Sequence, residues 1–313
     1  VGALCGAPTR TPPLRGRETA IMTNGPRPGP RIDVVHHDIA VRTLEVLRVL
    51  RVTARMVRVT LGGPELDGFV DRSPADHVKV FFPEPGTGRL VLPRVADDGD
   101  GLEFPTEPPF PLSRDYTTRR FDPVAGELDL DFVLHGRGTA ALWAERAEPG
   151  MRLGVAGPRG SIVVPWEFDW YLFAGDETAL PAVARMLENL PQGVPAKVFL
   201  LVDDAGEQEE LPTRADAEIV WLHRNGLAHG EGDFLDEAVR GVDFLPGLPF
   251  VWVAGEAGEL RPVRRYLHRE LGLNRAYTDV DGFWKRGVVG LDHHEPRDDE
   301  DGDAAPADNA PAA

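Results

Sequence analysis

Cysteine is almost absent from this sequence, and long apolar runs are absent altogether. Cys5 is the only cysteine in 313 residues, which excludes an intrachain disulfide and a metal site built from several cysteines. No apolar run approaches the roughly 18 residues of a membrane span. Residues 1–31 also lack the apolar core of a secretory signal. We therefore expect a cytoplasmic protein that is not inserted in a membrane.

Positive charge is scarce as well. The chain has 34 Lys and Arg against 51 Asp and Glu, a formal net charge of -17, so the basic face of a nucleic-acid-binding protein is not expected. Part of this acidity is local, because Arg297 is the only Lys or Arg between Asp292 and Asp308. We expect residues 291–313 to form an acidic disordered tail. We expect residues 1–31, rich in Pro, Gly and Arg, to form a disordered arm.

Residues 32–165 show the alternation of apolar and polar side chains that is typical of strands with one buried face. The runs 56–61, 76–82 and 127–135 are the clearest examples. Turns rich in Gly and Pro separate these runs, and one helix is predicted after Gly138, with Thr139 near its N-cap position. The pattern favours an antiparallel β-barrel.

Residues 166–290 follow a different pattern, in which continuous apolar strands alternate with helices. This alternation is typical of an α/β domain with a parallel sheet, and such sheets bind ligands at the carboxyl ends of their strands. No G-x-G-x-x-G motif is present, so the standard dinucleotide fingerprint is excluded. The predicted strands are 170–174, 197–202, 218–222 and 250–254, and the predicted helices are 180–190, 233–240 and 259–271.

The stretch from Arg114 to Arg119 gathers unusual chemistry into six residues. Arginine offers a planar fork of donors that fits a phosphate, while Tyr116 offers a flat face and Thr117 a small donor and acceptor. A flat cofactor that carries phosphates needs these three groups together. An exposed strand with ordinary polar residues is the alternative interpretation of so short a motif.

Together with other motifs, this stretch resembles the siderophore-interacting protein family, the FAD-dependent ferric-siderophore reductases of the ferredoxin-reductase-like superfamily. The resemblance implies an FAD-binding β-barrel at 32–165 and an NAD(P)H-binding α/β domain at 166–290. It also implies hydride transfer from NADPH or NADH to FAD, followed by one-electron reduction of an Fe(III)-siderophore and release of Fe(II). The matching stretches stand in family order: Asp76–Lys79, Arg114–Arg119, His135–Ala144, Ala174–Pro181, Trp221–Arg224, Val253–Glu256 and Phe283–Gly287.

The resemblance assigns the FAD site to the barrel. Arg114 would bind phosphate, Tyr116 would pack on the flavin and Thr117 would hydrogen-bond near its reactive nitrogen. The turn and helix start that would hold the pyrophosphate comprise His135, Gly138, Thr139 and Ala140, with Thr139 standing where the family usually has proline. Trp143 is expected to be a core residue.

The resemblance places the nicotinamide nucleotide at the strand ends of the second domain, and the ferric siderophore against a basic wall. Arg224 would pair with a 2′-phosphate and favour NADPH, or would simply be solvated. Neither a catalytic nucleophile nor a metal site is expected, since the flavin carries the chemistry. The nucleotide residues are Asp176, Glu177, Thr178, Gly255 and Glu256, and the wall comprises Lys79, Lys285 and Arg286.

Two alternatives stay open at this point. One is a flavin-dependent reductase that delivers electrons to another acceptor, such as ferredoxin. The other is a siderophore-binding protein without enzymatic activity.

Overall fold

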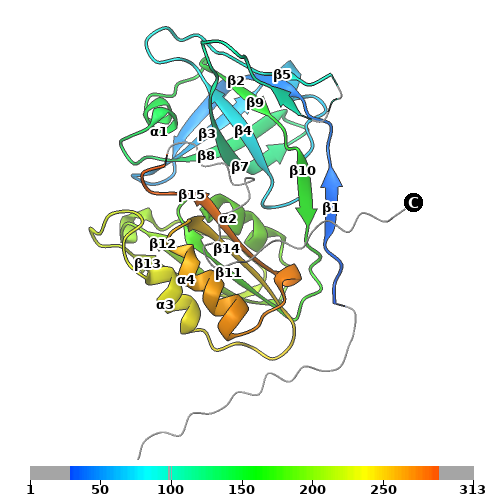
Figure 1. Cartoon of the computed structure of the whole chain (residues 1–313), viewed down its shortest axis with the longest axis vertical. Helices are drawn as coiled ribbons and strands as arrows, with labels where there is room; N and C mark the ends of the chain where they lie inside the picture. The colour runs from blue at the N-terminus through cyan, green and yellow to red at the C-terminus, as the bar shows by residue number, and fades with distance from the viewer. Residues whose placement is uncertain (1–28, 98, 100, 289–313) are drawn as a thin grey trace, which may run out of the picture.

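The computed structural model describes residues 29–288, apart from residues 98 and 100. These residues form a β-barrel and a parallel sheet with helices, one above the other in Figure 1. The two-part fold predicted from the sequence is therefore confirmed. The predicted tail and most of the predicted arm lie outside the described residues. No described helix is long and apolar enough to cross a bilayer.

The first unit is a closed antiparallel barrel with the strand order β2-β3-β8-β7-β4-β9. Alternation decides which side chains fill it: Val57, Val59 and Leu61 are buried in its core, whereas Arg58 between them points outward. Trp143 of α1 packs on this core, as predicted. The barrel elements are β2 Val41–Arg51, β3 Met56–Gly62, β4 His77–Phe82, β7 Leu112–Asp122, β8 Glu127–Val133, β9 Arg152–Ala156 and α1 Thr139–Ala144.

Several short elements lie outside the six strands of the barrel. The strands β1 (Asp33–His36) and β10 (Gly160–Val163) form an antiparallel ribbon, and η1 (Pro64–Leu66) follows β3. The strands β5 (Arg94–Val95) and β6 (Leu102–Glu103) pair antiparallel within residues 94–111, a stretch rich in Pro, Gly, Asp and Glu that favours a surface loop.

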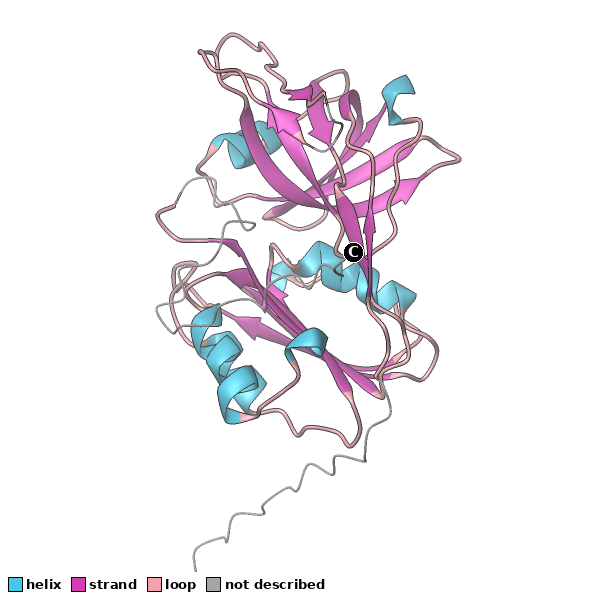
Figure 2. Cartoon of the chain, turned by 45° about the vertical axis from the view of Figure 1, so that its right-hand side comes forward, coloured by secondary structure: helices cyan, strands magenta, loops and turns pink. Residues whose placement is uncertain are grey.

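The second unit is a parallel sheet with the order β13-β12-β11-β14-β15. The central strand β11 contributes side chains to the cores on both faces of the sheet, because Phe173 packs with α2 while Leu172 packs with α3 and α4. Figure 2 shows the helices on the two sides of the sheet. The elements are β11 Trp170–Asp176, α2 Leu180–Asn189, β12 Pro195–Val202, η2 Ala205–Glu207, β13 Asp216–His223, α3 Phe234–Arg240, β14 Pro249–Glu256, α4 Leu260–Arg265, η3 Tyr266–Glu270, η4 Arg275–Tyr277 and β15 Thr278–Trp284.

Helix α2 joins the two units, since it lies between the sheet and β7 of the barrel (Figure 1). Arg185 of α2 donates to the carbonyl oxygen of Thr118 (2.7 Å) and to the carboxylate of Asp71 (2.8 Å). Burial raises the pKa of Asp71 to about 6 although Arg185 lowers it. A second junction lies at the β2–β3 turn, where Arg55 pairs with Asp203 of the second unit.

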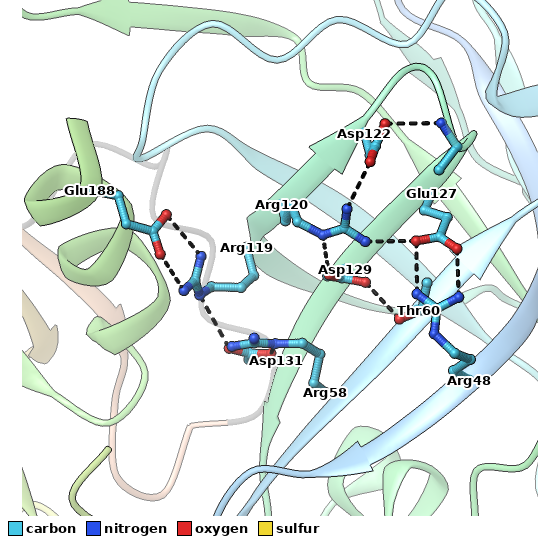
Figure 3. A network of polar contacts seen from close by, with 11 residues as sticks. Arg48, Arg58, Thr60, Arg119, Arg120, Asp122, Glu127, Asp129, Asp131 and Glu188 are labelled. Atoms are coloured by element: carbon cyan, nitrogen blue, oxygen red, sulfur yellow. Dashed lines mark hydrogen bonds and ion pairs between the residues drawn. The ribbon is translucent and has the colours of Figure 1, made fainter. Parts of the chain in front are cut away.

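A ladder of ion pairs covers the outer face of the barrel and reaches α2 (Figure 3). Arg58 of β3 is bidentate to Asp131, its register partner on β8. Arg119 of β7 lies 3.9 Å from Asp131 and 2.7 Å from Glu188 of α2. The charges that alternate with the barrel core therefore also tie the barrel to the second unit.

We expect Arg185→Ala to weaken this junction. The change leaves Asp71 buried without its cation, which should reduce the free energy of unfolding by about 2–4 kcal/mol. Urea unfolding at a pH above 7, where Asp71 is ionised, measures the loss. Arg94→Ala is the control, since its ion pair with Glu103 is exposed and should contribute less than about 0.5 kcal/mol. Equal losses in the two variants would contradict this account of the junction.

Candidate functional site

The first half of β7 has a neighbouring strand on one side only. Residues 112–117 pair with β4, whereas pairing with β8 begins at Thr118. The backbone N–H and C=O groups of residues 113–117 that point to the β8 side therefore face no described strand. Backbone groups in such a position need a ligand or water as a partner. This open edge of β7 is where the barrel can hydrogen-bond a cofactor.

Arg114 and Tyr116 flank the open edge and point to the same face of the strand. Arg114 donates to the carbonyl oxygen of Ser113 (2.5 Å) and makes no ion pair with any described residue. The Tyr116 ring lies 4.4 Å from the ring of Phe132, and burial raises the pKa of its hydroxyl above the usual range, against the nearby charge of Arg114. A half-buried guanidinium that pairs with no described carboxylate is well suited to bind a phosphate.

Thr117 points to the opposite face of β7, where His77 of β4 is its register partner. Alternation thus separates Thr117 from Arg114 and Tyr116, which the sequence alone does not make obvious. A ligand lying along the open edge can still contact all three. The donor set of an arginine, a phenol ring and a hydroxyl beside unpaired backbone fits FAD.

The turn after β8 presents backbone groups near this edge. Gly136 and Gly138 adopt φ values of 70° and 79°, a region that favours glycine. Thr139 is the first residue of α1, and Gly138 is its N-cap with no side-chain capping bond. Thr139 thus lies next to the N-cap position, as predicted, but its side chain makes no capping bond. Since α1 has only six residues, the turn contributes N–H groups rather than a strong helix dipole.

The end of β8, which leads into this turn, adjoins the second unit. Burial, with a smaller effect from the charge of His229, lowers the pKa of His135. Val133, at the end of β8, lines one small hollow with Glu177 and Asp203 of the second unit. His229 belongs to the segment between β13 and α3, beside the carboxyl ends of the parallel strands. The open edge of the barrel and the ligand-binding edge of the sheet therefore meet in one region.

Asp176 ends the central strand of the sheet and is fully enclosed. Its carboxylate accepts hydrogen bonds from the Thr178 backbone (2.9 Å), the Thr178 hydroxyl (2.5 Å) and the Trp284 indole (2.7 Å). Burial, helped by Glu177, raises the pKa of Asp176. Asp176 thus fastens β15 to β11, and its oxygens face the protein rather than a ligand.

Glu177 and Arg224 form a buried pair, with both terminal nitrogens of Arg224 on the carboxylate at 3.0 and 2.8 Å. Only 1% of the Arg224 side chain is exposed, so the expectation that it binds a 2′-phosphate is wrong. Burial would raise the pKa of Glu177, but His229 and Arg224 leave it lowered. The bond to Glu177, against burial, raises the pKa of His229.

Glu177, Asp203 and His229 bring possible metal ligands within 4.8 Å of one another. Arg224 already bonds both carboxylates, and its charge opposes that of a cation. The expectation of no metal site stays a prediction. The sequence also has two pairs of adjacent histidines: His37 of the first pair is hydrogen-bonded to the Ser161 hydroxyl, and residues 293–294 lie outside the described residues.

Gly255 and Glu256 end β14 beside Asp176. Gly255 has a φ of 151°, and a side chain there would meet a carboxylate oxygen of Asp176 at 2.8 Å, so glycine is required. The carboxylate of Glu256 accepts the backbone N–H groups of Glu259 (2.8 Å) and Arg286 (2.9 Å). Glu256 therefore holds the chain after β15 at the same edge.

The three predicted basic residues differ in how far their charge is compensated. Lys79 lies 2.8 and 3.0 Å from the two carboxylate oxygens of Asp115. Arg286 lies 2.6 Å from Glu231. Lys285 is exposed and makes no ion pair with any described residue.

The comparison with known proteins decides the family. The model of the siderophore-interacting FAD-binding domain matches residues 45–162, and the siderophore-interacting protein model matches residues 168–287. The chain belongs to the siderophore-interacting protein family. The predicted family is thus confirmed, and the two matches divide the chain between barrel and sheet.

Several members of this family are similar over most of the chain. The NADPH-dependent ferric-chelate reductase of Escherichia coli is 38% identical over 80% of this chain and 94% of its own length. A ferric vibriobactin reductase of Vibrio cholerae is 34% identical over 82% of this chain and 93% of its own. The crystal structure of a siderophore utilization protein from T. fusca has a TM-score of 0.80, with 48% identity, and covers 84% of this chain and 100% of its own. A ferredoxin reductase of carbazole 1,9a-dioxygenase, at 18% identity and a TM-score of 0.55, shares the fold.

Sequence reasoning did not identify Asp203, His229 or Glu259 as residues of this region. Asp203 follows β12 directly, so the rule that ligands bind at carboxyl ends of parallel strands was a usable signal. His229 and Glu259 lie in connecting segments, and nothing in their local sequence predicts their contacts. Both carboxylate oxygens of Glu259 are buried without a hydrogen-bond partner.

We expect Glu259 to make stability depend on pH. Burial, with the nearby charge of Asp176, raises the pKa of Glu259 to about 7 from an ordinary 4.5. Between these two pH values the folded protein binds more protons than the unfolded chain. The contribution of Glu259 to the free energy of unfolding is therefore fully present below pH 4.5 and is lost as the pH rises through 7. Glu259→Gln should be more stable than the native protein by about 1–2 kcal/mol at pH 8, after discounting for partial exposure.

Urea unfolding at pH 5 and pH 8 measures this difference, which should shrink at the lower pH. The control is Glu148→Gln, a change at an exposed carboxylate. A difference of the same size at both pH values would contradict the raised pKa.

Proposed function

We propose that this protein is a ferric-siderophore reductase that uses FAD and NADPH. The main support for the proposal is that two ligand-binding edges lie in the same region of the molecule. One is the open edge of β7, which fits FAD, and the other is the carboxyl edge of the parallel sheet. The relatives named as ferric-chelate and ferric vibriobactin reductases support the substrate class. The proposal places the reaction in the cytoplasm, where reduced nicotinamide nucleotide is supplied.

In this proposal the barrel holds FAD with its own side chains and backbone. Arg114 binds phosphate, the backbone of residues 113–117 and Thr117 bond the flavin, and Tyr116 lies against it. The turn comprising His135, Gly138, Thr139 and Ala140 supplies N–H groups to the pyrophosphate. When bound, FAD supplies the conversion of a two-electron donor into two one-electron reductions of Fe(III).

The edge of the sheet takes the nicotinamide nucleotide. The side chains of Asp176, Glu177 and Glu256 are occupied by the protein itself, so we infer that they shape the edge, while backbone groups around Thr178 and Gly255 contact the nucleotide. Arg224 does not bind a 2′-phosphate in this proposal. NADPH as the donor is supported by the name of the Escherichia coli relative.

We propose that the ferric siderophore enters at a mouth formed by Lys285, Lys79 and Arg286, with the exposed Lys285 as the leading contact. In this proposal none of the described residues ligates the iron. Fe(II) leaves because hard oxygen donors hold it less tightly than Fe(III).

Removing Arg114 should weaken the binding of FAD. Arg114→Ala deletes charge-assisted hydrogen bonds to phosphate, so the dissociation constant should rise by about 30-fold or more. Titration of the apoprotein with FAD, followed by flavin fluorescence, measures it. The exposed Arg89 provides the control variant Arg89→Ala. An unchanged affinity would show that Arg114 is not a phosphate ligand.

The function itself is tested by supplying NADPH and a ferric siderophore without oxygen and trapping Fe(II) with a ferrous chelator. Each NADPH consumed should yield two Fe(II), and Lys285→Ala should lower kcat/KM for a ferric siderophore with a single net negative charge by about tenfold. Lys197→Ala, on the opposite end of the sheet, is the control. NADPH oxidation that never yields Fe(II) would contradict the proposal. Fast turnover with ferredoxin that ignores Lys285 would favour the ferredoxin alternative.

A further inference from the structure

We propose that Asp115 restricts this reductase to ferric chelates that carry little net negative charge. This inference rests on the proposed function and specifies the substrate class of the same site. It gives a role to a carboxylate that lies inside the cofactor motif, between Arg114 and Tyr116.

Asp115 lies close to the position where the reaction is proposed to occur. It shares the outer face of β7 with Thr117, two residues away, and two residues of a strand span about 7 Å. Lys79 is its register partner on β4, just as His77 is the partner of Thr117. A chelate that approaches the flavin beside Thr117 therefore comes within reach of the Lys79–Asp115 pair.

Asp115 cancels the charge of Lys79. The ammonium of Lys79 lies within hydrogen-bond distance of both carboxylate oxygens, and the two side chains are 33% and 20% exposed. At this degree of burial the pair is held closely, and its net charge is zero. An anion that approaches Lys79 also approaches Asp115, so the pair offers it little attraction.

The charge of Arg286, another residue of the mouth, is compensated in the same way. Arg286 is paired with Glu231, and the carboxylates of Glu177 and Glu256 stand at the adjoining sheet edge. Among the described residues of the predicted basic wall, Lys285 alone keeps an uncompensated charge. The expectation of a wall of three cations is therefore replaced by one exposed ammonium near acidic groups.

Ferric chelates differ sharply in charge. Three hydroxamates, each with one negative charge, cancel the charge of Fe(III) and give a neutral complex. Three catecholates, each with two, leave a complex with three negative charges. One uncompensated ammonium suits the first class, whereas the second class gains little attraction, because Asp115 and Glu231 compensate the charges of Lys79 and Arg286.

The test uses Ga(III), which replaces Fe(III) in these chelates but is not reduced, so that binding is read without turnover. The measured quantity is the affinity for a Ga(III) tris-catecholate divided by that for a neutral Ga(III) trihydroxamate, obtained by calorimetry with the FAD-loaded protein. Asp115→Asn should raise this ratio by about tenfold at low salt, and the gain should shrink as ionic strength rises. Adding Lys79→Gln to Asp115→Asn should abolish the gain.

Glu218→Gln is the control, because it removes the same charge from a surface pair with Lys197 far from the mouth and should leave the ratio unchanged. If Asp115→Asn fails to fold, Glu231→Gln frees Arg286 by the same logic and should raise the ratio. A ratio that is indifferent to both variants, in a protein that still reduces ferric chelates, overturns the inference alone. A native protein that binds neither Ga(III) chelate and reduces no ferric chelate overturns the proposed function as well.

Discussion

The buried pair of Arg224 and Glu177 is the interaction on which the candidate site depends. Its two charges come from the ends of different strands, and the guanidinium also reaches Asp203 at the end of a third. Losing one partner of such a pair leaves an uncompensated charge, at a cost of about 3–5 kcal/mol. The pair thus fixes the edge of the sheet before any ligand is bound.

The same cluster connects the sheet to the barrel. Asp203 also pairs with Arg55 of the β2–β3 turn, and Val133 at the end of β8 lines one small hollow with Glu177 and Asp203. On the other side, α2 is fastened to β7 through Arg185. The position of the nucleotide edge relative to the barrel is thus set by these ion pairs together with an apolar contact, in which Val52, Met56 and Val133 pack against the core of the second unit.

Much of the fold follows from the sequence because its strands carry clear patterns. The apolar runs around Leu172, Leu200 and Val253 predict the centre of the parallel sheet, and the alternation around Leu130 predicts a barrel strand. The strand β15 was missed because Asp279, Asp281 and Gly282 interrupt its apolar positions, and only packing against β14 makes it a strand.

The site was less predictable, because its contacts join residues that lie far apart in the chain. Arg224 is a plausible phosphate ligand by position, yet its partner Glu177 lies 47 residues earlier, and no local pattern reveals the pair. The compensation of Lys79 by Asp115 depends in the same way on the register of β4 and β7. Motifs therefore predict a region, and long-range pairing decides which charges remain available in it.

The central claim is that FAD on the open edge of β7 lies within reach of a nicotinamide bound at the edge of the sheet. Mixing the FAD-loaded protein with NADPH, without oxygen or ferric chelate, tests it through the visible absorption of the flavin. The account predicts rapid loss of that absorption. Flavin that stays oxidised although both FAD and NADPH are bound would contradict it.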